Sequence, residues 1–180
     1  MALFIPPGFM MPLLPWLQSL QPVPESVPVW TEVMLRLLAA TAAGSILGLN
    51  REITQKPAGL RTHALVALGS ALVTVSALQL GVANNGTHAD AASRVMQGIV
   101  AGVGFIGGGV ILHEGDRNVR GLTTAATIWV AAALGISCGI GQWQIAGMAA
   151  VIALAVLVLG HFVERVLHRH QGDDEPPRKP

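Results

Sequence analysis

The sequence predicts an all-α membrane protein, a bundle of about five transmembrane helices, and two observations lead to that fold class. Hydrophobic residues make up 52% of the 180-residue chain and charged residues only 12%, whereas an ordinary soluble domain has about 25% charged residues. Five segments are mostly apolar and have the length of about 20 residues that a helix needs to cross a bilayer. A soluble core could bury one such helix, but five in so short a chain indicate a lipid environment.

The five predicted spans follow one another with short polar connections. Only Gly141 and Gln142 separate the last two, so these helices are expected to form an antiparallel hairpin. Residues 30–164 form the membrane domain, a Pro-rich segment at 1–29 is expected to be disordered or interfacial, and residues 165–180 are expected to form a polar cytoplasmic tail. The spans cover about residues 33–49, 62–80, 95–112, 122–140 and 143–163.

The distribution of Lys and Arg predicts the orientation of the bundle in the membrane. Basic residues cluster after the first span, after the third span and in the C-terminal tail, whereas the segment before the first span has none. Cytoplasmic loops of membrane proteins carry an excess of Lys and Arg. The N-terminus is therefore expected outside and the C-terminus in the cytoplasm.

The third span contains the string Gly102-Val-Gly-Phe-Ile-Gly107, which resembles the phosphate-binding fingerprint of dinucleotide-binding folds. That fingerprint needs a preceding strand and an acidic residue about 20 positions further on. Here the preceding residues belong to a spanning helix, so no nucleotide is predicted. In lipid, small residues let helices approach closely, which makes helix packing the favoured interpretation. The alternative is that Gly107–Gly109 loosens the helix beside an ion path. The predicted packing glycines are Gly44, Gly48, Gly98, Gly102, Gly104, Gly107, Gly108 and Gly109.

Two acid–base pairs lie at the membrane edge that is predicted to be outside. Glu32 precedes Arg36 by one helical turn, and Asp90 precedes Arg94 by the same spacing. A charge within a span costs about 3 kcal/mol on insertion scales and usually has a partner or a function. The four charges could form one mouth for an ion or a polar partner group. They could equally be two local pairs, with Arg36 extending to the interface.

Arginines and threonines gather at the end of the bundle that is predicted to be cytoplasmic. They could form an anion-binding surface at two helix N-termini, where backbone N–H groups point outward. Alternatively, the arginines anchor the loops in the cytoplasm and the threonines cap the helices. The candidate residues are Arg51, Glu52, Arg61, Thr62, His63, Arg120, Thr123 and Thr124.

Several function classes find little support in the sequence. The formal net charge of +1 provides no basic field for nucleic acid. The chain has no hydrolase, metalloprotease or dithiol motif, and its His, Asp and Glu residues are too scattered to predict a metal site. We therefore expect no enzyme activity, no metal and no cofactor. The expected partners are the lipid bilayer and either another membrane protein or further copies of the chain.

Three blocks of sequence resemble the membrane domain of the MgtC/SapB family. They are RLLAATAAGSILGLNREITQKPAGLRTHALVALGSAL, DAASRVMQGIVAGVGFIGGGVIL and VRGLTTAATIWVAAALGISCGIG, in the order and spacing of that family. The chain departs from the family pattern at Asn50, where the family has Glu, and at Ala91, where Pro is frequent. The resemblance maps family positions onto Arg36, Arg51, Glu52, Ala58, Gly59, Leu60, Arg61, Thr62, His63, Asp90, Arg94, Gly104, Phe105, Gly107, Gly109, Gly121, Leu122, Thr123, Thr124, Ala125, Ala126 and Trp129. Trp129 is assigned to helix packing.

The resemblance implies a multi-pass protein of the bacterial inner membrane, linked to growth at low magnesium, to stress and to virulence. It further implies a modulator of membrane partners such as the ATP synthase more than a magnesium transporter. The chain resembles the short, SapB-like form, because only about 17 residues follow the last span where MgtC-type members carry a soluble domain. Two functions remain in competition, a regulatory interaction protein and a small oligomeric permease for Mg²⁺, another cation or a solute.

Overall fold

The computed structural model describes residues 29–83, 88–114 and 118–171. Within these ranges the chain forms five helices and one small hairpin of two antiparallel strands. The predicted Pro-rich segment, apart from its last residue, and the last nine residues of the tail lie outside the described residues. The helices are α2 (Val29–Ile53), α3 (Leu60–Ala83), α4 (His88–Val110), α5 (Leu122–Ile140) and α6 (Trp143–Gln171), and the strands are β1 (Leu112–Glu114) and β2 (Asn118–Arg120).

Four of the five helices, α2, α3, α5 and α6, are long and apolar enough to cross a membrane. The chain is therefore a multi-pass membrane protein with the predicted all-α architecture. Helix α4 is the exception to the hydropathy criterion, since its first half carries Asp90, Arg94 and Gln97 and its second half is rich in glycine. Helix α6 continues to Gln171, beyond the predicted end of the fifth span. The short β1–β2 hairpin falls in a connection that the sequence predicted to be a loop.

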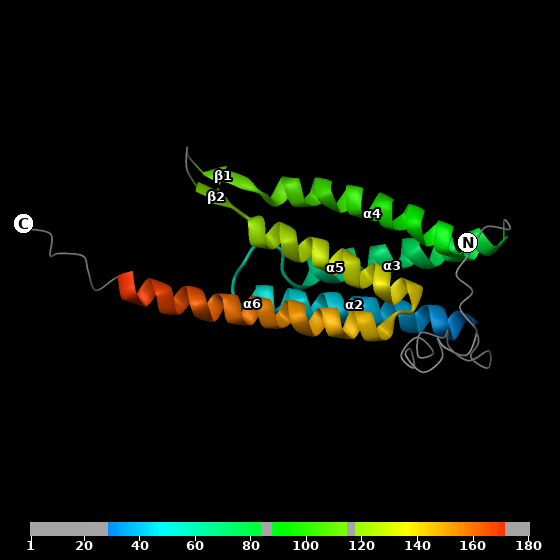
Figure 1. The fold of residues 1–180 in the computed structure, drawn as a ribbon, viewed down its shortest axis with the longest axis horizontal. Coiled ribbons are helices and arrows are strands. Elements are labelled where there is room, and N and C mark those ends of the chain that lie inside the picture. The colour runs from blue at the N-terminus through cyan, green and yellow to red at the C-terminus, as the bar shows by residue number, and fades with distance from the viewer. Residues whose placement is uncertain (1–28, 84–87, 115–117, 172–180) are drawn as a thin grey trace, which may run out of the picture.

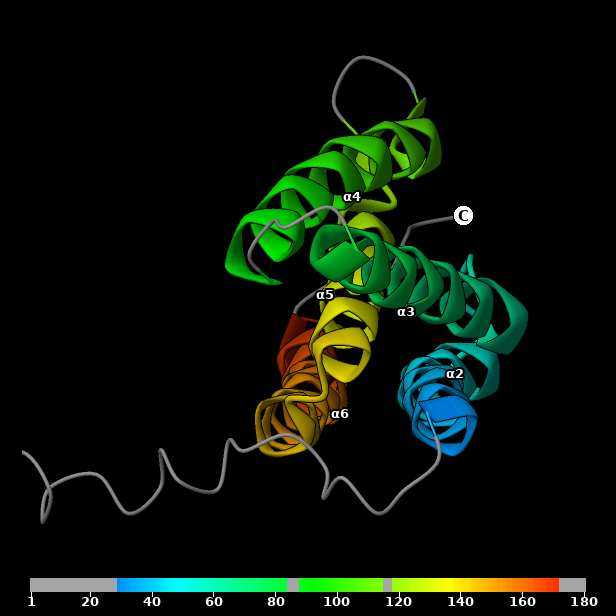
Figure 2. The ribbon, with the colours of Figure 1, turned by 90° about the vertical axis from the view of Figure 1, so that its right-hand side faces the viewer.

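Helices α3 and α5 form the middle of the bundle. Each packs on α2 and on α4, while α6 packs on α2 and α5. Viewed along the bundle, α4 lies on one side of the α3–α5 pair and α2 with α6 on the other (Figure 2). Helices α5 and α6 run antiparallel across the Gly141–Gln142 connection, as its length predicts (Figure 1).

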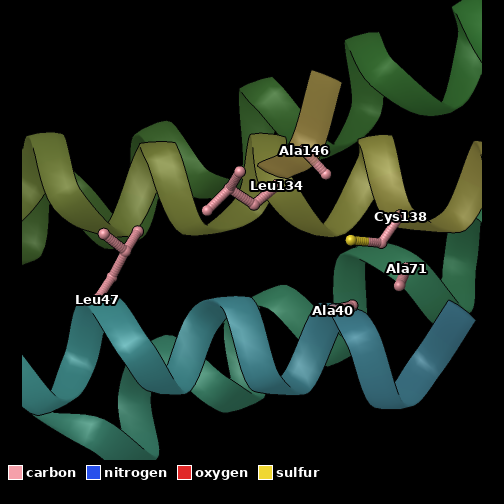
Figure 3. Packing of buried hydrophobic residues seen from close by; sticks show 6 residues of the cluster. All are labelled: Ala40, Leu47, Ala71, Leu134, Cys138 and Ala146. Atoms are coloured by element: carbon pink, nitrogen blue, oxygen red, sulfur yellow. The ribbon is translucent and has the colours of Figure 1, made fainter. Parts of the chain in front are cut away.

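The apolar core lies where α2, α3, α5 and α6 meet. It contains the fully buried side chains of Leu47 and Leu134, with Cys138 and three alanines beside them (Figure 3). Most large apolar side chains of α6 are instead exposed, for example Val151 and Phe162. In a bilayer these side chains contact lipid, so the small buried core is compatible with a stable membrane bundle.

Glycines allow the close approach of α2 and α5 to α3. A Cβ atom added at Gly44 would lie 2.5 Å from the carbonyl oxygen of His63, and one added at Gly48 would lie 2.6 Å from the Cα of Leu60. On α5, a Cβ at Gly135 would lie 2.3 Å from the carbonyl oxygen of Ala67. These contacts explain why small residues recur at four-residue spacing on α2 and α5.

Candidate functional site: a buried polar junction and an open helix face

The connection between α2 and α3 is fixed by a carboxylate at the start of α3. Oε2 of Glu52 accepts a hydrogen bond from the backbone N–H of Leu60 at 3.1 Å, which satisfies one of the unpaired donors of that helix end. A Cβ atom at Gly59 would lie 1.7 Å from the same oxygen. In the same connection Gln55 and Ala58 adopt positive φ angles of 52° and 57°, a conformation uncommon for residues other than glycine. The fold thus holds this short segment in one specific shape.

Arg51 lies at the end of α2 and is almost completely buried, with 5% of its surface exposed. Its Nη2 donates a hydrogen bond to Oγ1 of Thr124 at 2.5 Å. Thr124 is itself buried in the first turn of α5, and its carbonyl oxygen accepts from the hydroxyl of Thr127. The Nε–H of Arg51 is buried without a hydrogen-bond partner. A charged group in this environment is stable only when it is well hydrogen-bonded and neutralised.

His63 lies in the first turn of α3 and is fully buried. Its Nδ1 is 2.9 Å from the carbonyl oxygen of Gly59; since a carbonyl only accepts, Nδ1 carries the proton in this contact. Nε2 is buried and has no hydrogen-bond partner. The imidazole also lies close enough to Arg51 to interact with it electrostatically. We call Arg51, His63 and Thr124 the polar junction, since they bring α2, α3 and α5 together at one end of the bundle.

The structure separates the polar junction from the other residues of the predicted cytoplasmic motif. Arg61, Thr123 and Arg120 are exposed, and Thr62 is half-buried. Glu52 is exposed and serves as the cap of α3. Of the predicted anion-binding surface, therefore, only Arg51, His63 and Thr124 are buried.

Arg36 makes the equivalent link at the opposite end of the bundle. Its Nη2 forms the predicted ion pair with Glu32, one turn earlier on α2. Its Nη1 donates to the carbonyl oxygen of Gly139 at 2.8 Å, so the guanidinium binds the C-terminal turn of α5, where partial negative charge collects. Gly141 follows in the left-handed conformation, with φ of 91°, and a Cβ there would lie 3.1 Å from Nη2 of Arg36. The sequence indicated the Glu32 contact but not the Gly139 acceptor, because no pattern marks a backbone carbonyl.

Asp90 and Arg94 lie in a different part of the molecule from this ion pair. Both are exposed on α4, and α4 packs on α3 and α5, whereas α2 packs on α3, α5 and α6. The α3–α5 pair therefore separates the helices that carry the four charges (Figure 2). The described contacts of Arg36 are with α2 and α5, which favours the interpretation of a local Glu32–Arg36 pair.

The glycines of α4 divide into one buried position and one open face. Gly107 is buried, and a Cβ there would lie 3.5 Å from the Cβ of Ala125 on α5. Val103 and Ile99 pack on the same side. Phe105 is 87% exposed. An added Cβ would meet no atom within 4 Å at Gly98, Gly102, Gly104, Gly108 or Gly109; we call these five glycines with Phe105 the open α4 face.

Two further observations concern Trp129, which the sequence assigned to helix packing, and the arrangement of possible metal ligands. Trp129 is about half exposed on α5. No group of three or more His, Cys, Asp or Glu side chains among the described residues is arranged to hold a metal ion.

Comparison with known proteins gives one consistent result. The model of the MgtC family matches residues 37–166. The protein SrpB of Synechococcus elongatus is 46% identical over 123 residues, which is 64% of this chain and 68% of SrpB. The protein MgtC of Salmonella typhimurium is 44% identical over 126 residues, 70% of this chain and 51% of MgtC. The chain thus spans about half the length of its MgtC relatives. No solved structure matches it.

Proposed function

Because the chain belongs to the MgtC family, we propose that it is a regulatory interaction protein of the bacterial inner membrane and not an enzyme. In this proposal it contacts another membrane protein through the open α4 face. The family resemblance suggests a role under magnesium limitation, stress or virulence, and makes the membrane sector of the ATP synthase the first partner to test.

The open α4 face carries this proposal. Helices in lipid associate through small residues that allow backbone contact and through polar side chains. A Cβ atom added at the glycines of α2 and α5 that face α3 would meet backbone atoms of α3 or of the residues just before it. A Cβ atom added at five glycines of α4 would meet no atom within 4 Å. Gln97, near the start of the third predicted span, is also exposed on α4, and an exposed polar side chain in a span is costly against lipid. A partner helix on α4 would cover both features.

Site-specific photo-cross-linking in native membranes tests this surface. A photoreactive residue at Phe105, in the open α4 face, should give a defined cross-linked product. The same residue at Val156, which is 65% exposed on α6, should give only lipid adducts. Gly102→Leu should remove the product at position 105 while the purified protein keeps its thermal stability, because its side chain enters open space in the isolated bundle. Equal products at positions 105 and 156 would contradict the proposal.

The competing function is a permease for Mg²⁺, another cation or a solute. Asp90 and the consecutive glycines at 107–109 favour this alternative, since charged residues and loosened helices line ion paths in transporters. Proteoliposomes containing the purified chain should carry no flux for a panel of cations if the interaction function is right. Flux that Asp90→Ala abolishes, without a cross-linked partner, would favour the permease instead.

A further inference from the structure

The polar junction contains a buried positive charge whose described contacts do not neutralise it. The hydrogen-bond partner of the Arg51 guanidinium is a neutral hydroxyl, that of Thr124. Among the residues that the structure describes, no carboxylate forms an ion pair with Arg51; the neighbouring Glu52 caps α3 instead. Buried charges in proteins are paired or bind a ligand of opposite charge. The junction therefore has the character of a site for an anion.

The beginning of α5 strengthens this character. The helix starts after Gly121, which has a φ of 92°, and no side chain caps it. Uncapped N–H groups and the helix dipole favour an anion at such an end. The guanidinium of Arg51 reaches this end from α2, since it bonds to Thr124 in the first turn. A helix end and an incompletely paired, buried arginine thus meet at one place.

The unpaired atoms of the junction specify the kind of anion. The buried Nε–H of Arg51 is a donor without an acceptor, and the charge of the guanidinium favours an anionic oxygen in that position. In the neutral imidazole, the buried Nε2 of His63 is an acceptor, because Nδ1 holds the single proton against the carbonyl of Gly59, and it then needs an O–H donor. A phosphate group that retains one proton offers both an anionic oxygen and a hydroxyl. Sulfate, a carboxylate and a phosphodiester at neutral pH offer only acceptors.

We propose that Arg51, His63 and the first turn of α5 bind a phosphate group that carries a proton, either inorganic phosphate or the phosphomonoester headgroup of phosphatidic acid. Arg51 and the α5 N-terminus hold the anionic oxygens, and His63 accepts the hydroxyl. The site lies at the opposite end of the bundle from Arg36. It does not include the open α4 face. It therefore stands or falls independently of the interaction function.

Calorimetric titration of the full chain in phosphatidylcholine nanodiscs tests the free anion. Inorganic phosphate should bind at least about tenfold more tightly than sulfate at matched ionic strength, because sulfate leaves a buried acceptor unpaired. Arg51→Gln should abolish binding of both anions. His63→Asn, which removes Nε2, should bring the phosphate-to-sulfate ratio close to one. Arg61→Gln is the matched control, since it removes an exposed arginine from the same end of the bundle and should leave phosphate binding unchanged.

A second experiment, which measures bound lipids, distinguishes the two sources of the phosphate group. Native mass spectrometry of the purified chain should show retained phosphatidic acid in preference to phosphatidylglycerol, whose headgroup phosphate is a diester. The site would be assigned to the lipid headgroup if Arg51→Gln removes the retained phosphatidic acid and the wild-type chain binds no inorganic phosphate. Thermal unfolding of each variant checks its fold, and Arg51→Lys, which keeps the charge but lacks Nε–H, replaces Arg51→Gln if that variant unfolds.

Two results would overturn the proposal. One is that the wild-type chain retains no phosphatidic acid and binds inorganic phosphate no better than sulfate. The other is that Arg61→Gln weakens binding as much as Arg51→Gln, which would show a general effect of positive charge on the loop surface.

Discussion

Gly59 leaves the space in which the carboxylate of Glu52 caps α3. Gly59→Ala should push that carboxylate away from the N–H of Leu60, because the new Cβ would overlap Oε2. Loss of a helix cap costs about 1 kcal/mol, so the midpoint of thermal unfolding in detergent should fall. Gly69→Ala on α3 is the control, since its Cβ meets nothing within 4 Å and alanine favours a helix. An equal fall in both variants would contradict the capping role.

Arg36 is the residue that ties the start of α2 to the end of α5. Arg36→Gln should destabilise the bundle by about 1–3 kcal/mol, since it leaves Glu32 and the carbonyl of Gly139 without their charged donor. Unfolding of the purified protein by sodium dodecyl sulfate would measure this loss. Arg94→Gln, which removes an exposed arginine of α4, should change the unfolding free energy much less. Similar losses in both variants would show that charge alone, and not the contact with α5, is important.

At the scale of elements, glycine has opposite consequences on α2 and on α4. Gly44→Ala should destabilise the α2–α3 seam by about 1–3 kcal/mol, because the added methyl group overlaps the backbone of His63 and the helices must move apart. Gly108→Ala on α4 adds the same methyl group in open space and should leave the stability of the isolated bundle unchanged or raise it. Thermal unfolding of the two proteins in the same detergent compares them directly. Destabilisation by Gly108→Ala would mean that α4 packs more closely within the bundle than the structure shows.

The helices themselves could be predicted from the sequence because span length and apolar composition are local properties. The hairpin of α5 and α6 follows from a two-residue connection in the same way. Which helices occupy the middle of the bundle could not be predicted, since it depends on contacts between distant segments. Small residues at four-residue spacing occur on α2, α4 and α5 alike, yet only those of α2 and α5 meet the backbone of α3.

The candidate site also has features that the local sequence predicts and features that depend on contacts between distant segments. The sequence placed Arg51, Arg61 and Arg120 together as one basic end, and nothing in their spacing separates them. Only the packing of three helices buries Arg51 beside Thr124 while Arg61 and Arg120 remain exposed. The Glu32–Arg36 pair was predictable because both residues are on one helix, one turn apart. The bond from Arg36 to Gly139 was not, since it joins residues 103 positions apart.

At the scale of the whole molecule, the orientation in the membrane stays a prediction from the distribution of basic residues. In a Cys138→Ser background, Gln55→Cys in the α2–α3 connection should react with a membrane-impermeant maleimide only from the cytoplasmic side. Trp30→Cys, at the exposed start of α2, should react only from the outside. Labelling of intact spheroplasts and of inverted vesicles separates the two sides. The reverse pattern would invert the bundle, and with it the side from which the polar junction is reached.

The large separation of Arg36 from Gly139 along the sequence has a consequence for the synthesis of the protein. Ribosomes add about 5–20 residues per second, so the carbonyl that accepts from Arg36 is made roughly 5–20 s after the arginine, 103 residues later. During that interval Glu32, one helical turn before Arg36, has already been made and is available for the ion pair. The pair with Glu32 can therefore form before α5 exists, and the hydrogen bond to the carbonyl of Gly139 can form only after α5 has been made.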